Sequence, residues 1–472
     1  MTVATLPDSV AVVNIGLPMF ADAVREQGGP VQQVQWRVPA DGDPAAVRAL
    51  TALYGRHGDA LDRANAEVVR RLDEGVPQLV GIATVADVPG FADVAGGRAL
   101  LHCGPPIEYA QACDPLQRSM RAAVVAQGWA GDVAGADGLL RRGEVALSPA
   151  NHHDTVVPMA SAVGPAQPVM VVTNEAGGTR AYSPINQGPG EVAWFGRDTD
   201  AAIERLRFLA STVGPALAAI LEAAGPLDVL AVATQGITMG DDLHMRTQAA
   251  TNLLARTWLP HIAALPDAVR VPFASYLAGN HLFFLNLAMA AAKSLQLHAQ
   301  QVPGSSIVTT MSRNGTTFGI KLGGIDTWRI CPAPPVGEAL YYSGNGPDTS
   351  ARDIGDSAVL ELTGMGGPAA GGSAAVAAFL GGAMADAAAA TAGFRTICAG
   401  TSSRFTLPPL EFAGTPLGVD VRRVVETGVT PKITTGILHA SAGTGQVGAG
   451  VATAPMECFT EALLDLAARL DG

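Results

Sequence analysis

Strand-like and helix-like segments alternate at the start of the chain, and this alternation limits the fold more than any other feature. Residues 10–14 are apolar and strand-like, residues 18–27 have helical spacing, and residues 31–36 are strand-like again. This order is typical of a parallel βαβ unit. The alternation continues with helix-like and strand-like runs at residues 59–74, 78–83, 98–102, 115–127 and 145–147. We therefore predict a multidomain α/β protein that begins with a Rossmann-like parallel α/β domain, residues 1–145.

The middle third of the chain changes to helical spacing. Apolar residues recur at intervals of three and four residues over 203–221, 244–259 and 280–299, which predicts a helical domain over residues 198–302. Short β-rich runs then return at 306–311, 316–321 and 358–362. We assign residues 146–197 and 303–472 to a second α/β (α+β) domain. A length of 472 residues is too great for one hydrophobic core and agrees with several domains.

The composition excludes several classes of protein. The net charge is −12 and the basic residues form no run, so we expect no binding to nucleic acid. Charged residues make up only 15% and apolar residues 48%, which predicts extensive burial. The charge-free stretches 271–292 and 362–385 contain polar residues or clustered glycines, so we interpret both as core rather than membrane spans. Five cysteines without a CxxC pair and no secretory signal favour the cytoplasm.

A first candidate site is the run His152-His153-Asp154, which follows Ser148-Pro149. If this segment is extended, His152 and Asp154 share a face, because side chains alternate along a strand. A carboxylate beside an imidazole raises its basicity, as a general base requires. A loop whose histidines cap backbone groups would explain the same residues.

A second candidate site lies at residues 240–246. Asp241 and His244 are three residues apart, and Asp242 and Arg246 are four apart, so each pair lies on one face if the segment is helical. These residues could form a substrate-binding edge, or bind a divalent metal such as Mg²⁺, although their spacing matches no established closed metal site. An aspartate N-cap with an internal ion pair explains them equally well. The sequence requires no cofactor.

A third candidate is the hairpin signal Asn314-Gly315 between two strand-like runs. It predicts a two-residue turn that pairs Arg313 with Thr316. The predicted polar face of the hairpin is formed by Thr310, Ser312, Thr317 and Lys321. Arg313 at its end could bind a planar carboxylate or phosphate. A plain solvent-facing strand is the alternative.

The helix predicted at residues 280–300 is apolar except for a stripe of Asn286, Lys293 and Gln300, each seven residues apart. Polar groups on a buried helix need partners. Only three of the 30 basic residues are lysines, at positions 293, 321 and 432, which favours specific roles for them, although a composition biased toward arginine explains the same count. The glycine-rich residues 443–450 match the pattern GxGxxG, but 22 residues after them leave no room for a dinucleotide-binding unit.

Taken together, the motifs resemble the AllG/YlbE-like family. The similarity is carried by residues spread along nearly the whole chain: Asn14-Ile15-Gly16-Leu17, Trp36-Arg37, Gly104-Pro105-Pro106, His152-His153-Asp154, Met239-Gly240-Asp241, Gly279-Asn280-His281, Phe284-Leu285-Asn286-Leu287, Arg313-Asn314-Gly315, Gly355-Asp356-Ser357, Thr435-Gly436-Ile437 and Gly445-Gln446-Val447-Gly448-Ala449-Gly450. The resemblance implies a multidomain α/β fold with a helical insert. It also implies one subunit of oxamate carbamoyltransferase, which cleaves oxalurate with phosphate to oxamate and carbamoyl phosphate, in a hetero-oligomer with an FdrA-like subunit.

This chain departs from the family pattern at three positions. Asn151 stands where another histidine is commoner, and Asp242 and Met245 stand where glutamate and asparagine are commoner. These positions flank the candidate residues, so the carbamoyl acceptor could be a different amide or ureido carboxylate.

From residue chemistry we assign roles for carbamoyl transfer. We expect His152 or His153 to act as base with Asp154 orienting it, and His244 or Asn280 to polarise the carbonyl. The substrate-binding candidates are Asp241, Asp242, Arg246, Asn280, Asn286, Lys293, Arg313, Asn314 and Lys321. A scaffold subunit without catalytic residues, acting beside an FdrA-like partner, is the alternative.

Overall fold

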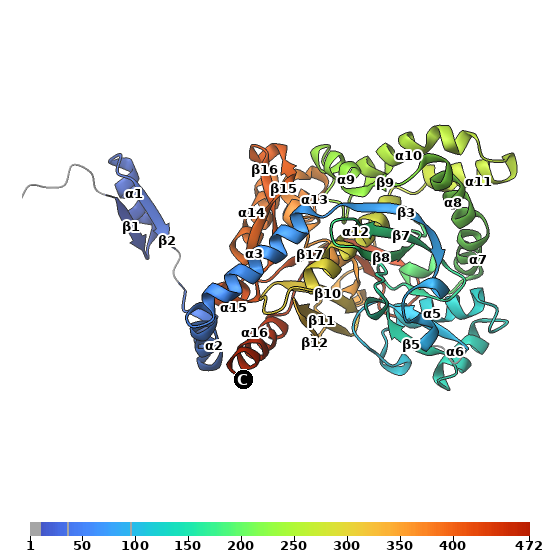
Figure 1. Cartoon of the computed structure of the whole chain (residues 1–472), viewed down its shortest axis with the longest axis horizontal. Helices are drawn as coiled ribbons and strands as arrows, with labels where there is room; N and C mark the ends of the chain where they lie inside the picture. The colour runs from blue at the N-terminus through green and yellow to red at the C-terminus, as the bar shows by residue number, and fades with distance from the viewer. Residues whose placement is uncertain (1–10, 35–36, 95–96) are drawn as a thin grey trace, which may run out of the picture.

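The computed structural model describes residues 11–34, 37–94 and 97–472 and shows a mixed α/β protein (Figure 1). The chain begins with β1 (Val12–Ile15), α1 (Pro18–Glu26) and β2 (Val31–Val34), and the two strands pair in parallel. The predicted βαβ unit is therefore confirmed, although residues 10, 35 and 36 of the prediction lie outside the described residues. Figure 1 shows this unit apart from the body of the protein.

The body does not continue this parallel sheet. β3 (Pro77–Thr84) lies antiparallel to β7 (Pro168–Asn174), which also pairs with β8 (Thr179–Pro184), and β9 (Leu227–Asp228) completes a four-stranded sheet. β4 (Ala99–His102) pairs in parallel with β5 (Ala146–Pro149) and antiparallel with β6 (Ala162–Val163). The predicted Rossmann-like arrangement is not confirmed, because the strands exist but find partners far along the chain. Strand pairing also crosses the predicted boundary at residue 145.

The α-helices described between β2 and β5 in the sequence are α2 (Pro44–Tyr54), α3 (Gly58–Glu74), α4 (Phe91–Val94), α5 (Asp114–Ala126) and α6 (Val133–Arg141). α2 packs on α15 (Val421–Thr427) and α16 (Met456–Asp471). α3 packs on α12 (Phe283–Gln300), β15 (Cys398–Leu407) and β16 (Ala413–Val419), whereas α5 packs on β6. Asp43 begins α2 by accepting hydrogen bonds from the backbone N–H groups of Ala45 and Ala46.

The predicted helical region is confirmed as helical. It contains α7 (Asp200–Phe208), α8 (Gly214–Ala224), α9 (Val229–Thr238), α10 (Gln248–Ala263), α11 (Asp267–Ala278) and α12 (Phe283–Gln300). The continuous segment Asp200–Ala224 is long and apolar enough to cross a membrane, but 44% of its most apolar window is buried, and core helices of soluble proteins share these properties. α12 is the central helix, because it packs against α3, β7, β8 and β10 and is buried along most of its length.

The last third of the chain forms three further sheets. Their strands are β10 (Val308–Asn314), β11 (Thr317–Leu322), β12 (Ile325–Pro332) and β14 (Ile354–Gly355); β13 (Val336–Tyr341), β17 (Lys432–Leu438) and β18 (Gln446–Thr453); and β15 (Cys398–Leu407) with β16 (Ala413–Val419). The accompanying helices are α13 (Ala374–Ala377), α14 (Met384–Ile397), α15 (Val421–Thr427) and α16 (Met456–Asp471).

Two predictions for this region need correction. Residues 358–362 were expected to be β-rich, but a 3₁₀ turn begins there at η8 (Ser357–Val359). The predicted hairpin exists, but Arg313 lies opposite Phe318 rather than Thr316. The Asn314 side chain causes the shift, because its Oδ1 accepts hydrogen bonds from the backbone N–H groups of Thr316 and Thr317. The face with Thr310, Ser312, Thr317 and Lys321 is nevertheless formed.

Candidate functional site

The candidate site is a polar cavity of about 490 Å³ beside the C-terminal half of α12. It is lined by Asn151, His152, Asp154, Lys293, Gln296, Leu297, Gln300, Thr309, Thr310, Lys321, Asp326, Thr327 and Trp328. Three separate parts of the sequence meet here: the histidine run, the polar stripe of α12 and the polar face of the β10–β11 hairpin. Two of the three lysines of the chain reach this cavity. We refer to it below as the lysine cavity.

Lys293 is the buried cation of the lysine cavity. Its side chain is 4% exposed, and its Nζ donates a hydrogen bond to Asn151 Oδ1 at 3.0 Å. Among the described residues no carboxylate lies within 4 Å of Nζ. Burial lowers the pKa of Lys293 from 10.5 to about 8, although the charge of Asp154 acts in the opposite direction. An unpaired buried ammonium group is costly, so the site favours an anionic ligand.

Lys321 also lines the cavity, and two groups hold its side chain. Its Nζ is 2.5 Å from Asp326 Oδ1 and 4.8 Å from the centre of the Trp328 ring. Trp328 in turn donates from Nε1 to His152 Nε2 at 2.8 Å. These contacts fix the ammonium group of Lys321 at the cavity wall.

The neighbouring Asn151 side chain has an unused hydrogen-bond donor. Asn151 is buried, its Oδ1 accepts from Lys293, and its Nδ2 has no partner among the described residues. Buried donors are nearly always satisfied in folded proteins. The unpaired amide therefore points to a ligand with acceptor oxygens.

The expected general base is not assembled as predicted. The segment forms a 3₁₀ turn, η4 (Ala150–His153), and Asp154 follows in the left-handed region with φ of 51°. His152 and Asp154 both line the cavity but form no hydrogen bond with each other. Burial and the charge of Lys321 lower the pKa of His152 to about 4, and its Nε2 accepts from Trp328. A weakly basic, occupied nitrogen is a poor proton acceptor.

The surroundings of His153 and Asp154 also differ from those predicted. His153 Nδ1 is 2.9 Å from the carbonyl oxygen of Pro89, so this nitrogen donates, while Nε2 lies 2.8 Å from Ser148 Oγ. Both ring nitrogens of His153 are therefore occupied within the fold, as in the capping alternative. Burial raises the pKa of Asp154 above its ordinary value, although the charge of Lys293 acts in the opposite direction.

Asp241 and Asp242 stabilise the local backbone. Asp241 accepts from the N–H groups of Ala249 and Ala250 at 3.1 and 2.8 Å at the start of α10, and Arg246 Nε lies 3.2 Å from it. Asp242 accepts from the backbone N–H groups of His244, Met245 and Arg246. These contacts match the N-cap and ion-pair alternative, and among the described residues no cluster of three or more His, Cys, Asp or Glu could hold a metal.

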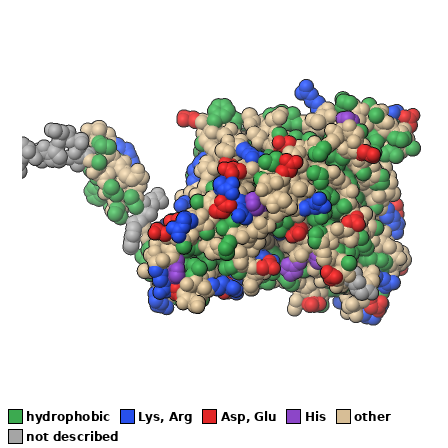
Figure 2. Space-filling model, in the orientation of Figure 1, with side chains coloured by type: hydrophobic (Ala, Val, Ile, Leu, Met, Phe, Trp, Pro, Cys, Tyr) green, Lys and Arg blue, Asp and Glu red, His purple; other side chains and the backbone are tan. Residues whose placement is uncertain are grey.

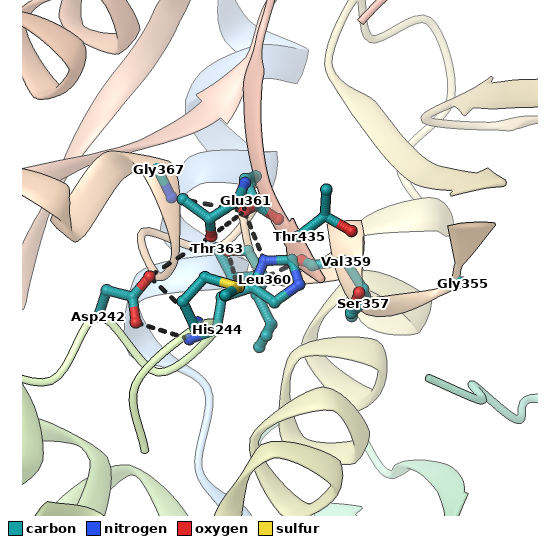
Figure 3. Close-up of polar contacts among 12 residues, drawn as sticks. Asp242, His244, Gly355, Ser357, Val359, Leu360, Glu361, Thr363, Gly367 and Thr435 are labelled. Atoms are coloured by element: carbon teal, nitrogen blue, oxygen red, sulfur yellow. Dashed lines mark hydrogen bonds and ion pairs between the residues drawn. The ribbon is translucent and has the colours of Figure 1, made fainter. Parts of the chain in front are cut away.

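His244 differs from its neighbours because its imidazole has a carboxylate partner. Its Nδ1 is 2.7 Å from Glu361 Oε1, and both side chains are buried. Figure 3 shows this pair between the loop that carries Asp242 and the turn that carries Leu360 and Glu361. His244 lines a second hollow of about 290 Å³, separate from the lysine cavity.

The other predicted binding residues are held inside the fold. Arg313 forms a fully buried ion pair with Asp353, at 2.7 and 2.8 Å from its two oxygens. Asn280 donates to Tyr276 Oη and the Asn186 carbonyl, and Asn286 donates to the Pro184 carbonyl. With Asn314 at its turn, these residues position the walls and do not line the lysine cavity.

Sequence reasoning missed Glu361 and Trp328. Glu361 is the only charged residue between Asp356 and Asp386, and a lone carboxylate in an apolar run needs a buried partner. That signal could have indicated an ion pair but not its partner. No pattern in the sequence indicated that Trp328 belongs to the site, because its contacts depend on the pairing of β11 and β12.

Comparison with known proteins relates the whole body of the chain to one family. A family model described as oxamate carbamoyltransferase subunit AllG matches residues 145–357, which contain every residue that lines the lysine cavity. Oxamate carbamoyltransferase subunit AllG of Escherichia coli (strain K12) is 36% identical over 410 residues, 86% of this chain and 97% of that protein. The uncharacterized protein YahG of the same strain is 32% identical over 459 residues, 96% of each chain.

A solved structure supports the same relation. A conserved protein of unknown function from Enterococcus faecalis V583 superposes with a TM-score of 0.83 at 32% identity, covering 87% of this chain and 98% of that chain. The mixed α/β fold is therefore shared with a protein of experimentally known structure.

Proposed function

Because the chain belongs to the family of oxamate carbamoyltransferase subunit AllG, we propose that it is a carbamoyltransferase subunit whose lysine cavity binds the anionic reactants. The observation that carries the proposal is the convergence of Lys293 and Lys321 in one cavity, with Lys293 lacking a carboxylate partner among the described residues. Phosphate and a small ureido carboxylate are both anions that two ammonium groups can hold. The amide of Asn151 and the hydroxyls of Thr309 and Thr310 supply further polar contacts in the cavity wall.

The reaction defines what these residues would do. Hydrogen phosphate attacks the ureido carbonyl of oxalurate, the C–N bond to the oxamate nitrogen breaks, and carbamoyl phosphate and oxamate form. The proton of hydrogen phosphate is transferred to the departing nitrogen, so atoms and charge balance. A group with a pKa near 8 can both give and recover a proton near neutral pH, and we assign this role to Lys293. Lys321 would neutralise the phosphate charge, and no step is assigned to His152 or His153.

The partners and location follow the same proposal. We propose a hetero-oligomer with an FdrA-like subunit and a position in the cytoplasm, where the five unpaired cysteine thiols of the described chain would stay reduced. The surface supports a soluble protein, because acidic and basic side chains are interspersed on the face shown in Figure 2, without an extended basic patch. The name of the related AllG protein, which is a carbamoyltransferase subunit, supports the role as a subunit.

The test is phosphate-dependent consumption of oxalurate by the purified chain, alone and with a co-expressed FdrA-like partner, while carbamoyl phosphate is followed. We expect turnover with the partner, and a loss of about 100-fold or more in Lys293→Met but not in the control Lys432→Met. Turnover that survives Lys293→Met would exclude the assigned role and leave the scaffold alternative. No turnover with or without the partner would contradict oxalurate as substrate and direct attention to Asn151, Asp242 and Met245.

A further inference from the structure

A second hollow, separate from the lysine cavity, lies at the start of α12. We refer to it below as the His244 chamber. Its volume is about 290 Å³, and most of its wall is apolar or aromatic. It is lined by Pro158, Met159, Pro189, Trp194, Phe195, His244, Met245, His281, Leu282, Leu285, Tyr342, Ser357, Phe379, Gly436, Gln446 and Ala449. An apolar hollow with few polar groups is typical of a small-molecule site.

The hydrogen bonds of Glu361 determine which nitrogen of the His244 ring donates a proton to it. Glu361 Oε1 accepts from the backbone N–H groups of Gly367 and Thr434, so this oxygen acts as an acceptor. His244 Nδ1, at 2.7 Å from the same oxygen, must therefore carry a proton and donate it. The Nε2 atom is left for another partner. In Figure 3 the ring nitrogen that does not face Glu361 lies toward Ser357, another residue of the chamber wall.

The backbone around the chamber is strained at two bulky residues. Met159 has φ of 47° and Leu243 has φ of 67°, a region that such side chains rarely adopt. Met159 lines the chamber and Leu243 directly precedes His244. Strain of this kind persists where the surrounding structure holds it, often at ligand sites. Glu361 Oε2 is also buried without a hydrogen-bond partner among the described residues.

The charges around the chamber select the kind of ligand. No lysine or arginine of the described part of the chain lines it, and the carboxylate of Glu361 lies behind His244. An anion would meet this negative charge without a cation to hold it, whereas a flat uncharged molecule can lie against the aromatic wall. The free Nε2 of a neutral imidazole accepts a hydrogen bond from an N–H group.

We propose that the His244 chamber is a second ligand site, for a planar uncharged molecule whose amide or ring N–H donates to His244 Nε2. Trp194, Phe195, Tyr342 and Phe379 provide the apolar contact surface. Glu361 is a positioning residue, because it fixes the tautomer and orientation of the ring. The proposal does not depend on carbamoyl transfer in the lysine cavity.

Benzamide tests the proposal, since it is planar, uncharged and carries an amide N–H. We expect saturable binding to the full chain by calorimetry, and weaker binding by about tenfold or more in His244→Phe, which has no acceptor atom and so loses one hydrogen bond. Benzoate, its anionic counterpart, should bind about tenfold more weakly than benzamide. Lys293→Met is the control and should bind benzamide as the unchanged protein does. Equal binding by His244→Phe, or stronger binding of benzoate, would overturn the proposal.

A second measurement guards against a misfolded variant. Methyl resonances of Met159 and Met245, which line the chamber from different segments, should shift on benzamide addition to the unchanged protein. Filling the chamber by Ala449→Phe should abolish these shifts while phosphate binding in the lysine cavity persists. Binding without any shift of either methyl group would place benzamide elsewhere and refute the assignment. Loss of phosphate binding alone would count against the lysine cavity and leave this chamber unaffected.

Discussion

Replacing Lys293 with methionine should stabilise the free protein although it removes anion binding. The side chain is 4% exposed, and burial lowers its pKa from 10.5 to about 8. A lysine whose pKa is lower in the folded state than in the unfolded state opposes folding while it is protonated. The penalty is therefore complete below about pH 8 and disappears as the pH rises past 10.5.

The size of this penalty follows from the two pKa values. Their difference corresponds to about 3 kcal/mol at pH 7 and leaves about 1 kcal/mol at pH 9.5. Methionine removes the charge, but Asn151 Oδ1 then loses its donor, which costs about 1 kcal/mol. We expect Lys293→Met to raise the free energy of unfolding by about 2 kcal/mol at pH 7 and to leave it nearly unchanged at pH 9.5.

The assay is urea unfolding at both pH values in buffer without phosphate, followed by calorimetric titration with phosphate at pH 7. Lys432→Met is the matched control, because Lys432 does not line the lysine cavity. A lower free energy of unfolding for Lys293→Met at pH 7 would refute the reasoning, since it would show that the protonated lysine stabilises the fold. Phosphate binding that survives the substitution would refute the anion site.

Three further changes test other parts of the structure. Arg313→Met should lower the free energy of unfolding by about 3–5 kcal/mol, because Asp353 is left buried without its cation; urea unfolding measures this, and a loss under about 1 kcal/mol would speak against it. Cyanate should carbamoylate Lys293 before Lys432 above pH 8, where its amine is uncharged, and phosphate should protect it; peptide mass spectrometry locates the adduct, and preferential modification of Lys432 would contradict the expectation. Deleting residues 1–36 should leave the melting temperature of the body unchanged in calorimetry, because β1, α1 and β2 lie apart from it; a clear fall would show that this unit packs on the body.

The sequence predicted the local faces that line the lysine cavity better than it predicted what their side chains do there. The spacing of Asn286, Lys293 and Gln300 indicated a polar stripe on a buried helix, and Lys293 and Gln300 do line the cavity. The period of two along β10 and β11 likewise predicted that Thr310 and Lys321 share a face. These patterns depend only on residues close together in the sequence, so they can be recognised without the tertiary structure.

The predictions that the structure does not confirm depend on contacts between residues far apart in the sequence. Each strand of the predicted parallel domain exists, yet β3 pairs with β7, and no local pattern specifies a partner about 90 residues away. The same limit affects chemistry. The guanidinium group of Arg313 could bind an anionic ligand, but it is already paired with Asp353. Burial and the charge of Lys321 lower the pKa of His152, so its imidazole is a weak base.

One helix separates two sites of opposite character. Leu285 of α12 lines the His244 chamber and Lys293 lines the lysine cavity, and eight residues of helix place them about 12 Å apart. If Glu361 lay beside Lys293, the two charges would pair, and the cation could no longer hold an anion. The fold instead gives Glu361 an imidazole and leaves Lys293 with a neutral amide, and the buried charge of Lys293 opposes folding by about 3 kcal/mol at neutral pH. Such a sacrifice of stability is expected where a buried charge is retained to bind a ligand.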